Sequence, residues 1–460
     1  MSSLNASLAT ALSGLMADQG AMETTTNNVA NVNTPGYSRQ VPVLVASDPV
    51  ELGQLAFGTG VTLQSVESIT DPLLESQIQQ QTQSENQYST LASALQQTQL
   101  NFTTTTSDIG TEITNFFNSL NQLSTDASDL STRQGVLTAA DNLATSFNTT
   151  ANNLTAQQQT LDLSVVQTVG QINQLSSQIA QLNGQISTLQ NSGESAGTFV
   201  DQRQQAIDQL SALVDVSVIP TDNTLTLTTA NGAPLVSGEQ SFQLSTQTNP
   251  AGLHEVYSEG NNITSQITSG QLGGTIEARD QQIPAIENQL DTLAAGIANS
   301  VNAVQTAGYD LNGNLATNEP LFNPPPANTT GAAASLSVAI TDPSLIAASS
   351  DGSSGSNGNA EAMYALGSQA IIEGQNPTDY YSGIVSNVGN AAADASAEQA
   401  ASSQILQQLN DQLSSVSGVS LDEEAANMVE YQDAYQASAQ VITTINDMMY
   451  AAIQMTTLTD

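Results

Sequence analysis

The sequence predicts a mainly α protein of elongated shape. It has coiled-coil helices at both ends of the chain, an elongated helical bundle and a small inserted β domain. Apolar residues recur every seven positions near both ends, and a proline-free helical pattern runs from Arg133 to Gln190. Between Val216 and Gly270 the pattern changes to alternation, which is typical of strands. The 460 residues are too many for one compact core, so several domains are expected.

We expect three domains, two of which combine segments that are distant in the sequence. Residues 1–60 and 418–460 form a terminal coiled-coil domain. Residues 61–215 and 271–417 form the elongated helical bundle. Residues 216–270 form the inserted β domain.

The first helix is expected from about Ser3 to Val29, where apolar side chains return at heptad spacing. A lone amphipathic helix of this kind is only marginally stable in water. Its apolar stripe therefore needs a partner. We predict that the assembly interface on this helix consists of Leu8, Leu12, Leu15, Met22 and Val29.

A turn is expected where this helix ends. Asn31 and Asn33 tolerate the left-handed conformation that closes a helix. Pro35 and Gly36 suit the central positions of a type II turn, because proline presets φ and glycine accepts a positive φ. Local chemistry alone indicates an ordinary helix-to-strand elbow. The string as a whole is more specific, and its motif residues are Asn28, Asn31, Asn33, Thr34, Pro35, Gly36 and Tyr37.

The chain after the turn is expected to be extended and then helical. Residues 41–45 and 60–66 are predicted strands, joined by a glycine-rich connection. A helix then opens near Asp71, with Pro72 in its first turn.

Long apolar seams predict that the middle of the chain packs helix on helix. At 1.5 Å per residue, the proline-free tract alone is about 85 Å long. We expect the helical seams at 113–130, 161–189 and 283–304, and a last bundle helix at 381–416.

The inserted segment is predicted to be β. Residues 216–220, 225–227 and 242–244 alternate with a period of two, and Asn231-Gly232 is a hairpin turn signal. His254 is the one histidine of the chain and follows a Pro-Ala-Gly loop signal. Without Cys or acids at ligand spacing it is expected to be a surface or packing residue.

A second heptad helix closes the chain. Gly418-Val419 interrupts the preceding helix, and Ser420 with Glu423 has the spacing of a capping box, with Ser420 as N-cap. The helix is expected to run to about Met455 and to pair with the N-terminal one. Its predicted assembly interface is Met428, Tyr431, Tyr435, Ile442, Ile445 and Met449.

Composition restricts the partners and the chemistry. The formal net charge is −39, and the chain has no lysine and only four arginines. Nucleic acid and anionic membrane are therefore not expected as partners. No secretory signal and no apolar run long enough to span a bilayer are visible. If the protein works outside the cell, it is expected to leave without a cleaved signal.

The same composition argues against an enzyme. With no Cys and one His, the chain lacks the parts of nucleophilic triads and zinc sites, so we expect no catalytic residue, no cofactor and no metal. The run from Ala307 to Asn314 misses the Gly and Glu that an EF-hand loop requires and is predicted to be a helix-ending turn. With 43 acids, counting alone leaves a paired-carboxylate hydrolase open.

Both ends of the chain resemble the bacterial flagellar axial proteins, the family of rod, hook and hook-associated subunits. The Asn-rich helix end followed by Asn-Thr-Pro-Gly-Tyr at 33–37 resembles their N-terminal signature. The runs 418–427 and 431–439 resemble the C-terminal signature of the hook-associated subunits, as do short stretches around 307–313 and 336–348. Arginines that members often carry near 67–70 are absent here, so any basic contact at that point is in doubt.

This resemblance implies a structural subunit at the junction between hook and filament. It implies a ring of copies in a helical tube, with the terminal helices lining the channel, the bundle outside them and the β insert facing solvent. The implied partners are the hook protein, the next hook-associated junction protein and an export chaperone on the C-terminal region. The implied location is the extracellular flagellum, reached through the flagellar export channel.

Two other hypotheses for the function are compatible with parts of the sequence. Another axial subunit, such as a hook or distal rod protein, would share the ends but have a β-rich middle, whereas the pattern here is helical from Leu74 to Gln190. A secreted coiled-coil adhesin or a hydrolase would belong to a different class. An adhesin would need a signal or secretion tail that the sequence does not display.

Overall fold

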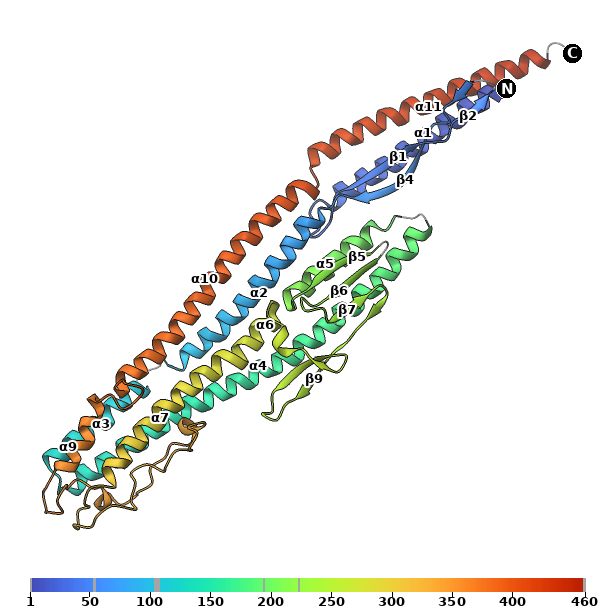
Figure 1. Cartoon of the computed structure of the whole chain (residues 1–460). Coiled ribbons are helices and arrows are strands. Elements are labelled where there is room, and N and C mark those ends of the chain that lie inside the picture. Colours follow the sequence, from blue (N-terminus) through green and yellow to red (C-terminus); the bar gives the residue numbers. More distant parts are fainter. Residues whose placement is uncertain (1, 53–54, 103–107, 193–194, 222–223, 458–460) are drawn as a thin grey trace.

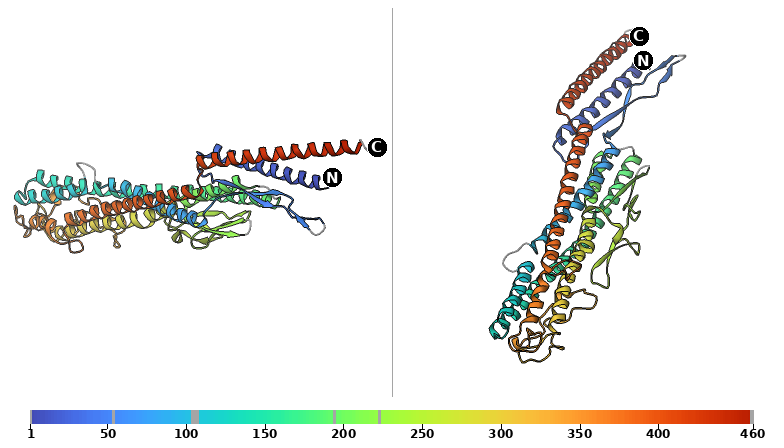
Figure 2. Two further views of the ribbon diagram at one scale, coloured as in Figure 1. Left: turned by 90° about the horizontal axis from the view of Figure 1, so that it is seen from above. Right: turned by 60° about the vertical axis from the view of Figure 1, so that its left-hand side comes forward.

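The computed structural model describes residues 2–52, 55–102, 108–192, 195–221 and 224–457. The described chain is a long rod of helices whose two ends lie together at one tip (Figure 1). Long terminal helices, a central helical bundle and small sheets confirm the predicted mainly α fold. Two further views show that the terminal helices extend beyond one end of the bundle (Figure 2).

The two ends of the chain pack against each other. Helices α1 (Ser2–Asn31) and α11 (Leu421–Thr457) run antiparallel and side by side. Strands β1 (Gln40–Ala46) and β4 (Val61–Ser68) form a two-stranded antiparallel ribbon against α1. The contact is close, because a Cβ built at Gly20 would lie 2.6 Å from Cδ2 of Leu63.

A small hairpin lies within this ribbon where the sequence predicted only a glycine-rich connection. It consists of β2 (Val50–Leu52) and β3 (Leu55–Phe57), which pair in antiparallel fashion. Each strand is three residues long, which is too short for alternation to be recognised.

The bundle is built from helices whose apolar stripes pack in one large core and one separate, smaller cluster. Its long members are α2 (Pro72–Leu100), α3 (Ile109–Thr125), α4 (Leu130–Ser192), α7 (Ile283–Gln305) and α10 (Pro377–Ser417). Helix α2 begins after Asp71, whose carboxylate accepts hydrogen bonds from the Leu73 and Leu74 amides at 3.1 Å. The core is formed by residues including Phe116, Leu120, Phe147, Leu290, Leu293, Ile297 and Phe322.

The helical middle predicted from Leu74 to Gln190 consists of separate helices. Helix α2 ends at Leu100 and α3 ends at Thr125, before α4 begins at Leu130. Leu130 therefore lies outside the α3 seam that was predicted to include it, and it is 51% exposed. When the apolar residues of two successive helices keep the same spacing across a short loop, heptad spacing alone does not reveal that the helix is broken there.

Helix α4 joins the bundle to the insert. It has 63 residues and is about 95 Å long. Its first half contributes Val136, Leu143 and Phe147 to the bundle core, whereas its second half contributes Val165 and Ile172 to a second core.

The second core belongs to the insert and α5 (Gly197–Leu213). Buried residues such as Leu227, Leu235 and Val256 pack on α4 and α5. One sheet has the order β5-β6-β7-β8 and another has the order β11-β10-β9. The strands are β5 (Ser217–Thr221), β6 (Thr224–Thr228), β7 (Pro234–Ser237), β8 (Gln240–Ser241), β9 (Leu244–Thr248), β10 (His254–Ser258) and β11 (Asn261–Asn262).

The local predictions for the insert hold in part. Asn231-Gly232 does lie in the β6–β7 hairpin, where Gly232 has φ +86° and its amide donates to the Thr229 carbonyl at 2.9 Å. Phe242, predicted in a strand, lies between β8 and β9. The domain limits at 216 and 270 stay a prediction, since α4 and α5 share the core of the insert.

A largely buried polar cluster links the insert to α4, and the partly exposed His254 packs within it. His254 begins strand β10, and its Nδ1 lies 2.6 Å from Oδ2 of Asp162 on α4. Arg279, in the π-helical turn Ala278–Gln282, donates to Oδ1 of Asp162 and to the His254 carbonyl, both at 2.7 Å. Burial alone would raise the pKa of Asp162, but the hydrogen bonds from His254 and the Arg279 charge hold it below its usual value.

The connection between α7 and α10 wraps the far end of the rod. It contains α8 (Ala332–Ser335), α9 (Gly358–Ala365) and the short 3₁₀ turns Pro343–Leu345 and Leu366–Ser368. Buried Arg133 holds this connection, because its guanidinium donates to the carbonyls of Ala127 and Ile346.

The calcium-like run in this connection is a turn, as predicted. Asp310 accepts hydrogen bonds from the Asn312 and Asn314 amides at 2.8 and 2.7 Å. In the stretch 336–348, which resembles the hook-associated subunits, Val338 forms an isolated β-bridge with Phe322.

Replacing Asp162 by Asn should lower the free energy of unfolding by about 2–4 kcal/mol, because the buried Arg279 guanidinium would lose the negative charge that it contacts. The measurement is urea unfolding followed by circular dichroism. Asp141→Asn is the matched control, since Asp141 is an exposed aspartate of the same helix. Equal stability of the two variants would contradict this role for the cluster.

Candidate assembly interface and domain joint

The turn after α1 has the predicted type II geometry. The Tyr37 amide donates to the Thr34 carbonyl at 3.2 Å, and Gly36 has φ +74°. The predicted left-handed closure is wrong, because neither Asn31 nor Asn33 is among the described residues with positive φ. Helix α1 ends instead with the Thr34 amide donating to the Asn31 carbonyl at 2.8 Å.

Asn28 is the buried centre of the motif. Only 1% of the residue is exposed. Its Oδ1 accepts from the Gln40 amide at 2.9 Å and from the Tyr37 hydroxyl at 2.8 Å. Its Nδ2 donates to the Gln40 carbonyl at 2.8 Å and to Oε2 of Glu424 at 3.1 Å. One amide therefore connects α1, the turn, β1 and α11.

Arg39 completes this connection from the other side. Its Nε donates to Oε1 of Glu424 at 2.7 Å, and its Nη1 lies 2.7 Å from Oε2 of Glu423. Glu424 is 1% exposed, so its charge is compensated by the guanidinium and by the Asn28 amide. Local sequence gives no signal for this pair, because Arg39 and Glu424 are 385 positions apart in the chain.

The predicted helix cap has a different role here. Helix α11 does begin at Leu421, directly after Ser420, and the Glu424 amide donates to the Ser420 carbonyl at 3.0 Å. The Glu423 carboxylate, assigned by sequence to the cap, is paired with Arg39. Glu423 and Glu424 at this helix end thus bind Arg39, which follows the turn. They also lie at the positive end of the helix dipole, where negative charge is stabilised.

The turn also touches the bundle. The Arg39 amide donates to the carbonyl of Ser417, the last residue of α10, at 2.9 Å. The Ile69 amide donates to the Arg39 carbonyl at 2.8 Å, just before α2. We call the contacts of Asn28, residues 34–40, Ser417 and Glu423–Glu424 the joint.

Several buried side chains of α1 are small, where the helix packs against α11 and the β1–β4 ribbon. Ala11, Ala17 and Ala21 are 9%, 1% and 0% exposed, and a Cβ built at Gly14 would lie 3.4 Å from Ser438 Oγ of α11. The larger residues of the predicted stripe are less completely covered. Leu8, Leu15 and Met22 are half-buried, whereas Leu12 and Val29 are exposed.

On α11 the predicted face is the covered one. Ile445 is buried, and the other five predicted residues, Met428, Tyr431, Tyr435, Ile442 and Met449, are half-buried. Large apolar side chains nevertheless remain outside this contact on both helices. They are Leu12, Met16 and Val29 on α1, and Val429, Val441, Met448, Tyr450 and Ile453 on α11.

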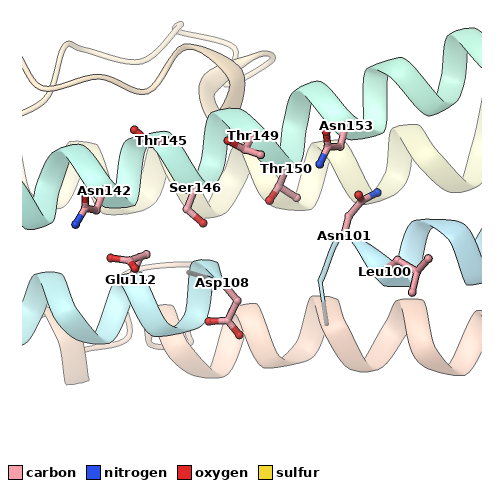
Figure 3. Close-up of a pocket in the computed structure, with 10 residues that line it drawn as sticks. All are labelled: Leu100, Asn101, Asp108, Glu112, Asn142, Thr145, Ser146, Thr149, Thr150 and Asn153. Carbon is pink, nitrogen blue, oxygen red and sulfur yellow. The ribbon is translucent and has the colours of Figure 1, made fainter. Parts of the chain in front are cut away.

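A polar cleft in the bundle tests the hydrolase alternative. Figure 3 shows Asp108 and Glu112 on one side and a row of Asn, Thr and Ser side chains of α4 on the other. The cleft is about 540 Å³, and its ten lining residues include no His, Lys or Arg. Asp108 caps α3 by accepting from the Thr111 amide at 2.6 Å. The cleft therefore has two carboxylates among its lining residues and no cationic side chain.

The described part of the chain has no group of three or more His, Cys, Asp or Glu placed to hold a metal ion. Within the same part, every helix is too short or too polar to cross a membrane.

Three family models match the chain. Residues 95–322 match the helical domain of the flagellar hook-associated protein FlgK. Residues 401–455 match the C-terminal region of the flagellar basal body rod proteins FlgEFG, and residues 8–37 match the flagella basal body rod protein model. The two rod-protein matches contain most of α1, the turn and most of α11.

Individual relatives agree with this assignment. Flagellar hook-associated protein 1 of Bacillus subtilis is 31% identical over 503 residues, covering 98% of each chain. That of Escherichia coli is 27% identical, covering 97% of this chain and 98% of its own. The structure of the flagellar hook junction protein FlgK from Burkholderia pseudomallei has a TM-score of 0.67 at 20% identity. It covers 74% of this chain and all of that one, and shows the same fold.

The fold, the joined ends and these matches define the class, a structural protein of the bacterial flagellum that assembles with other flagellar proteins. The near-complete relationship to the Bacillus protein identifies the family, and the chain belongs to the flagellar hook-associated protein 1 family. Its function is that of a structural subunit at the junction between hook and filament.

Replacing Asn28 by Ala should weaken the joint, because buried groups of Gln40, Tyr37 and Glu424 lose their partner. Each such group costs about 1–3 kcal/mol when unsatisfied. Hydrogen exchange measured by mass spectrometry should show faster exchange in β1 and α11 with the bundle unchanged. Asn33→Ala is the control, since Asn33 is an exposed residue of the same motif. Unchanged protection of α11 in the Asn28 variant would contradict this assignment.

Proposed function

We propose that this junction subunit completes its fold only on assembly, when α1 and α11 pack against the terminal helices of neighbouring copies. The observation that carries the proposal is the set of large apolar side chains left outside the α1–α11 contact. Met16 is 65% exposed and Tyr450 is 66% exposed. A helix pair that buries alanines and leaves such residues in water gains little from its own contact. Neighbours that cover these side chains would supply the missing stabilisation.

In this proposal the subunits form a ring within the flagellar tube. The terminal domain lies innermost and lines the channel, the bundle lies outside it, and the β insert faces solvent. The rod shape supports this order, because the terminal helices project from one end of the bundle while the insert lies along its side (Figure 1). The joint then sets the angle at which each bundle meets the inner layer.

The proposed partners are copies of the same chain, the hook protein and the next hook-associated junction protein. An export chaperone is proposed on the C-terminal region. The subunit would act outside the cell, after export through the flagellar channel. Family membership supports these assignments. The net charge of −39 supports the absence of nucleic acid and anionic membrane from the partners.

We also propose that the protein is not an enzyme. Its relatives are hook-associated proteins of the flagellum, and the residues that line the polar cleft include no His, Lys or Arg. The match of the middle of the chain to the FlgK helical domain favours the junction subunit over a hook or rod subunit.

Limited proteolysis of the monomer tests coupled folding. Chymotrypsin should cut within α1 and α11 before it cuts the bundle, and assembly should protect both helices. Tyr450 on α11 and Tyr364 on α9 are 66% and 42% exposed, so they compare the same residue type in the two regions. Cleavage at Tyr364 before or together with Tyr450 would show that the terminal helices are as stable as the bundle.

Association of purified subunits should strengthen as salt rises or as the pH falls mildly. The region from Leu421 to the end has seven acids and no base, so copies repel each other there. Sedimentation velocity at increasing ionic strength measures the effect. Asp433→Asn with Asp447→Asn, both at exposed positions of α11, should associate at lower salt. Association that weakens as salt rises would contradict the repulsion.

A further inference from the structure

Methionine is concentrated in the two terminal helices. Six of the eight methionines lie in α1 and α11, although these helices have only 30 and 37 of the 460 residues. Met363 on α9, by contrast, is 0% exposed and belongs to the bundle core. The chain has no cysteine and no tryptophan, so the thioether of methionine is its side-chain group most easily oxidised by peroxides. The terminal helices therefore carry most of the oxidisable groups of this protein.

Two of these methionines are exposed in the free subunit. Met16 of α1 is 65% exposed, and Met448 of α11 is 53% exposed. The other methionines of these helices with described side chains are half-buried, namely Met22, Met428 and Met449. A small water-soluble oxidant therefore reaches Met16 and Met448 first.

Both residues lie within the apolar faces that the α1–α11 contact leaves uncovered. Leu12, four residues before Met16, is 47% exposed, and Val441, seven residues before Met448, is 48% exposed. Residues at these spacings lie on the same face of a helix. In the proposed function, neighbouring copies cover these faces, so each thioether becomes buried among apolar side chains on assembly.

We propose that Met16 and Met448 are sites of reversible oxidation, and that their conversion to the sulfoxide stops the terminal helices from packing against neighbouring copies. The oxidant is hydrogen peroxide. The sulfur lone pair attacks one peroxide oxygen, the O–O bond breaks, and the proton of the transferred oxygen passes to the departing hydroxide. The products are methionine sulfoxide and water, so the sulfur loses two electrons and the peroxide gains them. This inference rests on the proposed function, because it concerns the same contact between copies.

The sulfoxide acts on assembly through its polarity. The thioether is flexible and apolar, so it fills the gaps of an irregular contact. The sulfoxide oxygen accepts hydrogen bonds from water in the free subunit, and the apolar neighbours Leu12 and Val441 offer no side-chain donor to replace them. Burial of a polar group without such a replacement is unfavourable. Oxidised subunits therefore stay apart, whereas assembled subunits are protected because their neighbours cover both sulfurs.

Peptide mass spectrometry of the full-length monomer, treated with dilute hydrogen peroxide, tests the two sites. Met16 and Met448 should gain an oxygen at least about fivefold faster than the buried Met363. The same treatment in concentrated urea is the control, since all three residues should then react at similar rates. Equal rates at Met16, Met448 and Met363 in the folded protein would overturn the assignment of the sites.

Sedimentation velocity, at a salt concentration at which the parent associates, tests the effect on assembly. Oxidation should lower the association constant of the parent at least about tenfold. Methionine sulfoxide reductase with a dithiol should restore association, because the two thiols become a disulfide and the oxygen leaves as water.

Three double variants decide the cause. Met16→Leu with Met448→Leu should still associate after peroxide treatment, since leucine has a similar volume and is not oxidised. Met22→Leu with Met428→Leu, at half-buried positions, is the matched control and should lose association on oxidation as the parent does. Met16→Gln with Met448→Gln introduces polar groups at the exposed positions and should associate as weakly as the oxidised parent, without any peroxide.

The outcomes separate this inference from the proposed function. Association that survives oxidation of Met16 and Met448, or that is lost equally when both are leucine, overturns the inference and leaves the proposed function standing. A parent subunit that associates at no salt concentration contradicts the proposed function, and this inference fails with it.

Discussion

The arrangement of the whole molecule depends on one buried ion pair, that between Arg39 and Glu424. Residues 385 positions apart are held at 2.7 Å, with the Asn28 amide on the second oxygen of the carboxylate. A buried charge left alone is costly, so the pair and its hydrogen bonds must form together. Their formation sets α11 beside α1, positions the turn and brings both chain ends to the same tip of the rod. The rigid bundle then serves as the base from which this pair of helices projects.

The packing of the terminal helices explains why they suit an assembling subunit. Gly14 on α1 allows Ser438 of α11 to approach closely, and large apolar side chains of both helices stay exposed within one chain. The larger residues that would stabilise a coiled coil lie partly outside that contact. In the bundle the opposite holds, because phenylalanine, leucine and isoleucine fill one continuous core. The joint thus lies between a bundle with a large apolar core and a helix pair with exposed apolar side chains, which in the proposed assembly neighbours would cover.

The site could be predicted from the sequence only in outline. Pro35 and Gly36 determine their turn locally, so the turn type was foreseeable from two residues. The residues selected by heptad spacing are buried or half-buried on α11, whereas Leu12 and Val29 of the stripe on α1 are exposed, and their part in assembly stays a prediction. Spacing identifies a stripe and does not say which edge of it a partner covers. The pairing of Glu423 with Arg39 instead of its own helix end depends on a residue that the chain brings near only on folding.

The sequence by itself determined the mainly α class, the positions of the long helices, the turn and the relationship of both ends to flagellar axial proteins. These features follow from periodicity and turn chemistry, which act over a few residues. Only the tertiary structure decided that α4 contributes to two cores. It also decided that Asp162 contacts both His254 and Arg279. The contacts of Glu424 with Asn28 and Arg39 likewise depend on the folded chain. These are contacts between residues far apart in the chain. Their existence depends on burial and on which charges can be compensated there, and neither is encoded in local spacing.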